Sequence, residues 1–290
     1  MGNNESGLSK HIETARKTNV LQYDNKKLNE IRPQMCIPGL RTLSLNDNEI
    51  QQLPQEIRNL TNLKVLSLRN NHIDTLADVF GPLHKLENIQ LNMNTLHGLP
   101  PSFTNLKGLK QLNLSQNKFT NFPIAILKLN NLQFLDLSSN YITKIPDEIE
   151  TLQVDELSLN QNRIMQISEK ISRCQRLKTL RLDNNQLELD AIPVSLLKDS
   201  NVSLISLEGN KFDAKSLQSY DGYDQYTQRY TAIRRNKSNQ LQQTVNSRDD
   251  NYQHALNIRR KRQINDDYDN IKDDNIADYV ENNDIQEGYL

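Results

Sequence analysis

The chain has 290 residues, a formal net charge of −1 and a hydrophobic content of 36%. Its nearly neutral balance gives no general attraction to the phosphate backbone of nucleic acid, so we expect no nucleic-acid partner. The low apolar content means that core residues recur very regularly, or that part of the chain lies outside any core.

The two cysteines, Cys36 and Cys174, are too few for the disulfide frameworks of extracellular repeat proteins. The first residues lack the apolar run of a secretory signal, and no stretch approaches the ~20 apolar residues of a membrane span. These features predict a protein of a reducing compartment, and we expect a cytoplasmic location.

The chain begins with the six-residue pattern of an N-myristoylation site. Gly2 becomes the N-terminal residue once Met1 is removed, and acyl transfer needs an amine without a neighbouring side chain. Asn3 is small and uncharged, and Ser6 occupies the preferred hydroxyl position. The alternative is a start in which glycine and serine occur by chance. We expect the motif to be used, which makes the chain a lipoprotein anchored at the cytosolic face of a membrane.

Residues 1–17 form the first predicted region, which combines this motif with a capping helix over residues 8–17. Leu8, Ile12 and Ala15 share one face of that helix. A degenerate repeat then starts near Thr18. It has apolar residues at the expected spacing but lacks an asparagine found in all later repeats.

A pattern of the form L-x-x-L-x-L-x-x-N-x-L returns eight times between residues 40 and 212, with a period of about 23 residues. This period does not follow the 3.6-residue spacing of amphipathic helices. The pattern resembles that of the leucine-rich-repeat family. The ninth position of the eight repeats holds Asn48, Asn71, Asn94, Asn117, Asn140, Asn162, Asn185 and Asn210.

We therefore predict an α/β solenoid over residues 18–212, a leucine-rich-repeat horseshoe with a parallel sheet on its concave side. Each L-x-L segment is typical of a short strand that points alternate side chains into a shared core. The asparagine amide both donates and accepts, so it can satisfy backbone groups at the bend that follows. Leu-Pro, Phe-Pro and Ile-Pro pairs between the strands predict loose helical or 3₁₀ turns on the convex side.

The outward positions of the strands predict a partner-binding surface. Most of these positions hold small polar residues, and the larger apolar, aromatic or charged ones are the candidate contacts with a protein partner. The alternative, at least as well supported for any single residue, is that these side chains only pack across strands. The candidate contacts are Val65, Arg69, Met93, Phe134, Asp136, Arg181 and Asp183.

Two further regions follow the repeats. Residues 213–237 contain four tyrosines and predict a C-terminal cap. Residues 238–290 hold six basic and eleven acidic residues, a net charge of −5, and predict a disordered acidic tail. Within it Arg259–Arg262 resembles a nuclear localisation patch, although a nuclear location is the less favoured prediction.

Several stretches are similar to one family, leucine-rich-repeat-containing protein 57. The likeness covers roughly residues 1–237 and excludes the acidic tail. It implies an intracellular repeat protein held at the membrane by a lipid, with no established biochemical activity. The stretches that carry it are Met1–Asn3, His11–Ala15, Lys17–Thr18, Leu152–Leu157, Asn160–Asn162 and Gly222–Tyr226.

No phosphate-binding loop, dinucleotide fingerprint, nucleophile elbow or zinc motif occurs in the sequence. We expect no enzyme activity, no cofactor, no metal and no small-molecule substrate. The sequence predicts a membrane-tethered scaffold or adaptor that binds a protein on its concave face. The alternative is a soluble regulatory subunit of a phosphatase or a small-GTPase pathway, which rests on fold analogy alone.

Overall fold

The computed structural model describes residues 2–232. The predicted acidic tail, the basic run Arg259–Arg262 and the end of the predicted C-terminal cap lie outside the described residues.

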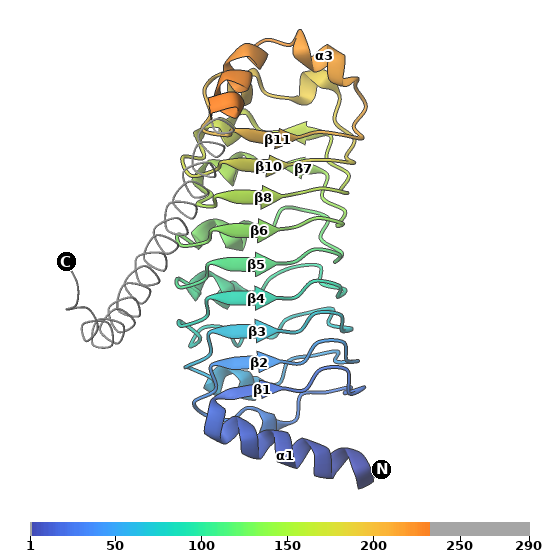
Figure 1. Ribbon diagram of the computed structural model, residues 1–290, viewed down its shortest axis with the longest axis vertical. Helices are drawn as coiled ribbons and strands as arrows, with labels where there is room; N and C mark the ends of the chain where they lie inside the picture. The colour runs from blue at the N-terminus through green and yellow to red at the C-terminus, as the bar shows by residue number, and fades with distance from the viewer. Residues whose placement is uncertain (1, 233–290) are drawn as a thin grey trace, which may run out of the picture. The chain divides into compact units, whose positions relative to one another are not determined.

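The dominant element is a nine-stranded parallel sheet in which successive strands pair in chain order, as predicted (Figure 1). The central residues of neighbouring strands lie side by side, so the leucine columns of the sequence become stacked columns in space. The strands are β1 (Val20–Gln22), β2 (Thr42–Ser44), β3 (Val65–Ser67), β4 (Asn88–Gln90), β5 (Gln111–Asn113), β6 (Phe134–Asp136), β8 (Glu156–Ser158), β10 (Thr179–Arg181) and β11 (Leu204–Ser206).

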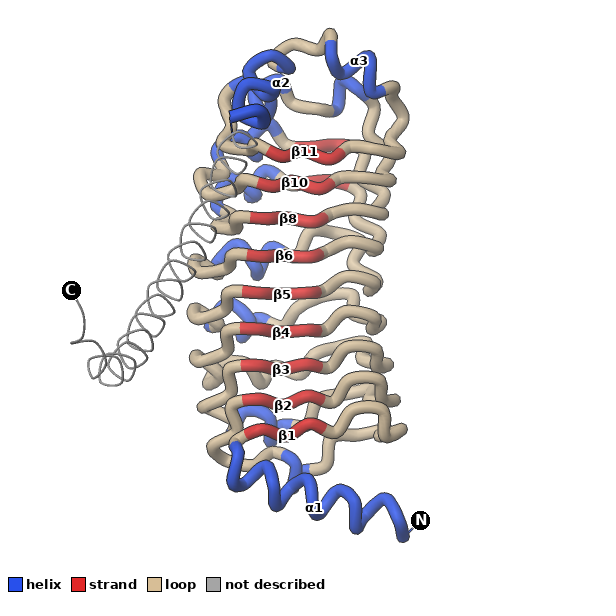
Figure 2. The backbone as a smooth tube through the Cα atoms, viewed as in Figure 1, coloured by secondary structure: helices blue, strands red, loops and turns tan. Residues whose placement is uncertain are grey.

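Short helical segments lie between most successive strands, which confirms the predicted 3₁₀ character of the convex side (Figure 2). Residues 68–87, between β3 and β4, contain no helical segment. Proline precedes most of the five-residue segments, where it takes the extended backbone of the N-cap position and its missing N–H prevents strand pairing. A second sheet pairs β7 (Lys144–Ile145) with β9 (Gln166–Ile167). The 3₁₀ segments are η1 (Pro33–Met35), η2 (Gln55–Asn59), η3 (Pro101–Asn105), η4 (Ile124–Lys128), η5 (Asp147–Thr151), η6 (Glu169–Arg173) and η7 (Leu189–Ala191).

The core is one continuous column between the sheet and the helical segments. In every repeat from the first to the seventh, the leucine or isoleucine at the fourth and sixth positions is 0% exposed. The 3₁₀ segments η1 to η6 each add a buried residue, such as Phe103 in η3, whose ring lies 4.9 Å from that of Phe80. Because each repeat buries its apolar face only against its neighbours, stability depends on stacking.

The repeat asparagines form a hydrogen-bonded ladder beside this core. Asn117 shows the pattern: its Nδ2 donates to the carbonyls of Leu91 and Leu114 at 3.0 Å, and its Oδ1 accepts the Leu96 N–H at 2.9 Å. One amide therefore joins two consecutive repeats at the point where the chain bends. The other seven asparagines make the equivalent contacts.

The residue before each of the eight asparagines, and Asn25 at the equivalent position of the degenerate repeat, have left-handed backbone geometry, with φ between 53° and 72°. This conformation turns the chain out of the strand and favours Gly, Asn and Asp, which occupy five of the nine positions. Because φ is positive there, a β-branched residue would be strained in every repeat. The positions are Asn25, Asp47, Asn70, Met93, Gln116, Ser139, Gln161, Asn184 and Gly209.

Helix α1 (Gly2–Thr18) covers the N-terminal end of the solenoid. It begins six residues before the predicted start at residue 8, because residues 2–7 contain no helix-breaking proline and carry no apolar periodicity that could reveal the extra turn. Leu8 and Ala15 are 3% and 1% exposed, and the ring of His11 packs edge-on against Tyr23 at 5.0 Å.

The C-terminal end carries α2 (Val194–Lys198), α3 (Ala214–Gln218) and a helical stretch over residues 223–232. Arg229 joins this stretch to the preceding repeat: its guanidinium donates to the carbonyls of Leu196, Leu197, Lys198 and Val202.

Candidate functional site

The outward side chains of the nine-stranded sheet, together with the turn residues that follow each strand, form the surface that we call the concave face. In most strands the central residue is buried in the core and its two neighbours face outward and are partly exposed. The strict alternation follows from the pleat of a β-strand. The register of the sheet therefore decides which outward residues become neighbours.

Four of the predicted contact residues lie close together on this face. Phe134 and Asp136 are the outward residues of β6, Arg181 is an outward residue of β10, and Asp183 follows two residues later. Strand β8 lies between β6 and β10, and its Glu156 is the register neighbour of Phe134.

The other predicted contacts are farther along the sheet. Val65 belongs to β3, Arg69 lies just after it, and Met93 follows β4. Met93 is not a strand residue at all, because it occupies the left-handed turn position with φ 58°. The sequence offered a signal for this turn in the recurrence of Asn, Asp and Gly one residue before the repeat asparagine.

Arg181 is held by an ion pair. Its Nε lies 2.7 Å from Oε1 of Glu156, and both side chains remain about one third exposed. The guanidinium is thereby fixed against Glu156 of β8, the register neighbour of Phe134, with donors left for a partner. The sequence did not predict this pair, because Glu156 and Arg181 are 25 residues apart and meet only across the neighbouring strands β8 and β10.

The carboxylates of the concave face also bind backbone. Oδ1 of Asp136 accepts the Ser138 N–H at 2.9 Å, and Oδ1 of Asp183 accepts the Glu208 N–H at 2.9 Å. These bonds satisfy backbone N–H groups just beyond the ends of the strands, so both residues have a structural role whether or not they contact a partner. They also hold the two charges in fixed positions.

The repeats match known families. Residues 18–123 match the family described as leucine-rich repeat region, and residues 131–152 match the leucine-rich repeat. A leucine-rich-repeat protein of Leptospira interrogans is 33% identical over 68% of this chain and 51% of its own, with a TM-score of 0.62. This chain is a leucine-rich-repeat solenoid.

Two plant receptors have similar folds. The peptide hormone receptor RGFR1, solved in complex with RGF2, is 27% identical over 66% of the solenoid's chain, with a TM-score of 0.57. The second structure is the ectodomain of the receptor kinase GASSHO1/SCHENGEN3 from Arabidopsis thaliana, in complex with CASPARIAN STRIP INTEGRITY FACTOR 2. It is 27% identical over 66% of this chain, with a TM-score of 0.56. This chain spans 32% and 24% of those structures, and half of the Leptospira protein.

Charge is unevenly distributed along the concave face of the solenoid. From β6 to β11 the outward positions hold four carboxylates, whereas Arg181 is the only cation among those positions in the described residues. From β1 to β5 they hold two carboxylates and Arg69, and β4 and β5 are entirely uncharged. The four carboxylates are Asp136, Glu156, Asp183 and Glu208.

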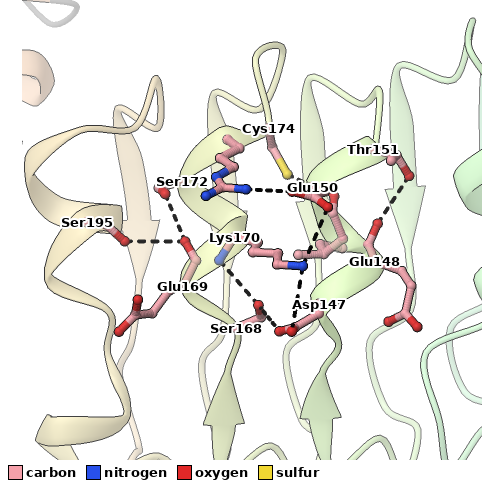
Figure 3. A network of polar contacts seen from close by, with 12 residues as sticks. Asp147, Glu148, Glu150, Thr151, Ser168, Glu169, Lys170, Ser172, Cys174 and Ser195 are labelled. Atoms are coloured by element: carbon pink, nitrogen blue, oxygen red, sulfur yellow. Dashed lines mark hydrogen bonds and ion pairs between the residues drawn. The ribbon is translucent and has the colours of Figure 1, made fainter.

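The outer side of the solenoid carries a second polar network around η5 and η6 (Figure 3). Lys170 lies 3.8 Å from Asp147 and 3.6 Å from Glu150, and Arg173 also pairs with Glu150 at 3.0 Å. Ser168 donates to Asp147, and this bond is the main reason that the pKa of Asp147 is lowered. The network links consecutive helical segments, so it is best explained as packing between repeats.

The two cysteines are buried and take no part in any site. Burial raises the pKa of Cys36 to about 11 and that of Cys174 to about 12, with Glu56 and Glu150 adding to the effect. Thiolates are therefore scarce at neutral pH. Over residues 2–232, no three histidine, cysteine or acidic side chains are grouped closely enough to hold a metal ion.

Gly2 is the first residue of α1. This helix packs on the solenoid through Leu8, Ile12 and Ala15, so the predicted acylation site lies at the free end of a helix whose later turns are anchored to the core. No helix in the described part of the chain has the length and apolar character needed to cross a membrane.

Proposed function

We propose that this solenoid is a protein-binding scaffold whose main contact surface is the concave face between β6 and β10. The observation that carries the proposal is the grouping of Phe134 with the fixed Arg181–Glu156 pair on adjoining strands. Aromatic residues and arginine are enriched among the residues that dominate interface energies. Small polar residues surround this group and leave the surface accessible.

The similar plant receptors support a protein partner, since one is a peptide hormone receptor solved with RGF2 and the other was solved with CASPARIAN STRIP INTEGRITY FACTOR 2. They share the fold and about a quarter of the sequence, so the identity of their ligands does not carry over to this chain. The proposal assigns no catalytic role to the solenoid.

We further propose that a myristoyl group on Gly2 tethers the scaffold to the cytosolic face of a membrane. The acceptor motif and the similarity to the leucine-rich-repeat-containing protein 57 family support this. One myristoyl chain gives a partition constant of only about 10⁴ M⁻¹, so the attachment is reversible unless a partner or a second signal adds to it.

Comparative affinity capture tests the partner surface. We expect the full chain to retain specific proteins that are lost when Phe134→Ala and Arg181→Gln are combined. A matched control removes one exposed apolar residue and one cation from η4, through Ile124→Ala and Lys128→Ala, and should leave capture unchanged. Equal losses from both variants, or no loss from the first, would reject the site.

Mass spectrometry of the N-terminus tests the tether. The mature chain from its native host should carry a 14-carbon acyl group on Gly2, and Gly2→Ala should move it from the membrane to the soluble fraction. An unmodified Gly2 in that material would reject the tether and leave the concave-face proposal intact.

A further inference from the structure

The C-terminal end of the solenoid contains an apolar cavity of about 560 Å³. Glu208 and Gly209 are its polar boundary. Its size falls within the range of about 300–1,000 Å³ that is typical of ligand pockets. Its apolar lining consists of Ile205, Leu207, Phe212, Leu217, Tyr223 and Tyr226.

This cavity exists because the last repeat is incompletely covered. Ile205 and Leu207 occupy the fourth and sixth positions, which are fully buried in the seven preceding repeats but only partly buried here. Helix α3 has five residues (Figure 2), and the next helical stretch begins at residue 223. Beside these two elements, Ile205 and Leu207 remain only partly buried and line the cavity.

The walls of the cavity are held in place, which prevents a collapse that would close it. The hydroxyl of Tyr226 accepts the Ile205 N–H at 3.1 Å and also lies 3.3 Å from the Ile205 carbonyl. Tyr220 donates to the Ile192 carbonyl at 3.1 Å, and Arg229 ties the cap to α2. A fixed apolar cavity at an exposed end offers a ready seat for an apolar side chain.

The surroundings of the cavity are acidic. Glu208 lines it, Asp183 binds the Glu208 N–H, and Asp213 caps α3 directly after the lining residue Phe212. Asp224, next to the lining residue Tyr223, is exposed. The cations closest in sequence are the exposed Lys211 and Lys215, because the Arg229 guanidinium is engaged with backbone carbonyls.

We propose that this cavity and its acidic surroundings bind a cationic amphipathic segment of a partner protein, whose large apolar side chain enters the cavity. The carboxylates favour arginine or lysine beside that side chain and disfavour acidic or carboxylate-bearing ligands such as fatty acids. The inference rests on the proposed function in one respect: Asp183 and Glu208 continue the concave face, so the segment would belong to the same partner.

Fluorescence anisotropy with the full chain and three labelled peptides tests this. The probe is a 14-residue helical peptide with arginine on one face and leucine and phenylalanine on the other. In the second peptide glutamate replaces arginine, and in the third serine replaces the apolar residues. We expect binding of the first peptide and at least tenfold weaker binding of the other two.

Charge-neutral variants locate the binding. Asp183→Asn combined with Glu208→Gln keeps the acceptor for the Glu208 N–H and removes two charges, and should weaken binding of the probe roughly tenfold. The matched control is Asp24→Asn with Asp47→Asn at the opposite end of the concave face, where Asp24 accepts the Asn46 N–H in the same way. That control should bind the probe as the wild type does.

Leu217→Ser tests the cavity itself, with circular dichroism to show that the fold is retained. It should weaken binding of the probe, whereas Ile124→Ser, at an apolar residue that is 61% exposed elsewhere, should not. Equal binding of all three peptides, or equal effects at both ends of the concave face, would overturn the inference. The combined Phe134 and Arg181 variant should still bind the probe, so failure of the proposed function remains distinguishable.

Discussion

The two ends of the solenoid bury the apolar core of their terminal repeats to different extents. At the N-terminal end, α1 lies across the first repeat and leaves Leu21 at 0% and Tyr23 at 4% exposure. At the C-terminal end, the short α3 and the residues after 222 leave the last repeat partly open around a cavity. Both ends carry a cap, and within residues 2–232 the N-terminal cap buries the adjoining core more completely than the C-terminal cap does.

The difference shows that capping a repeat protein requires both an apolar face and sufficient length. Helix α1 has 17 residues and reaches across the whole end of the core. The five residues of α3 cannot do so. An end that is sealed contributes to stability, whereas an end that stays open retains apolar surface that another molecule can cover.

The largest expected effect compares the central residues of the first and last strands. Leu21→Ala should lower the free energy of unfolding by about 3–4 kcal/mol, because it opens a void in a fully buried site. Ile205→Ala should cost only about 1–2 kcal/mol, because that side chain is already partly exposed. Urea denaturation of the full chain measures both. Equal costs would contradict the difference between the ends.

Replacing an asparagine of the ladder should likewise cost more unfolding free energy inside the solenoid than at its C-terminal end. Asn117→Ala leaves the buried Leu96 N–H without its acceptor and removes one of the two asparagine donors from each of the Leu91 and Leu114 carbonyls, and should cost about 2–3 kcal/mol. Asn210→Ala removes equivalent bonds at a partly exposed position, where water can replace them, and should cost about 1 kcal/mol. Urea denaturation measures both costs, and a larger cost for Asn210→Ala than for Asn117→Ala would contradict this prediction.

Arginine at the two caps provides a third comparison. Arg229→Met removes the donors that hold the C-terminal cap and should cost about 1–2 kcal/mol. Hydrogen exchange should rise first in residues 223–232. Arg16→Met in the exposed last turn of α1 should stay within about 0.5 kcal/mol of wild type. A comparable loss in both variants would show that the caps are held alike.

The smallest effect lies between the ends, at Glu87. Lys110 at 2.7 Å and Lys64 at 2.8 Å lower the pKa of Glu87 from 4.5 to about 2. The folded-state pKa is depressed, so this stabilisation is fully present above about pH 4.5 and is lost as the pH falls towards 2. Glu87→Gln should therefore be slightly less stable than wild type at pH 6 and indistinguishable from it near pH 2. A constant difference across this range would contradict the ion-pair assignment.

Much of the fold was predictable because the repeat is local and periodic. The positions of the strands, their parallel order and the inward leucines follow from spacing alone, and the structure confirms them. The left-handed turn was present in the sequence as an excess of Asn, Asp and Gly, but it required the backbone to be recognised. Candidate contact residues could be placed on the concave face by register, and their function remains a proposal.

The sequence by itself determined the periodic middle of this protein, since each repeat meets only its neighbours and the same residues recur at each contact. The tertiary structure decided what breaks the period. It set the length of α1, the Arg181–Glu156 pair, the engagement of Arg229 and the open core beyond β11. These contacts join side chains outside the repeating core positions, so no recurring pattern announces them, and packing in three dimensions alone fixes which partners meet.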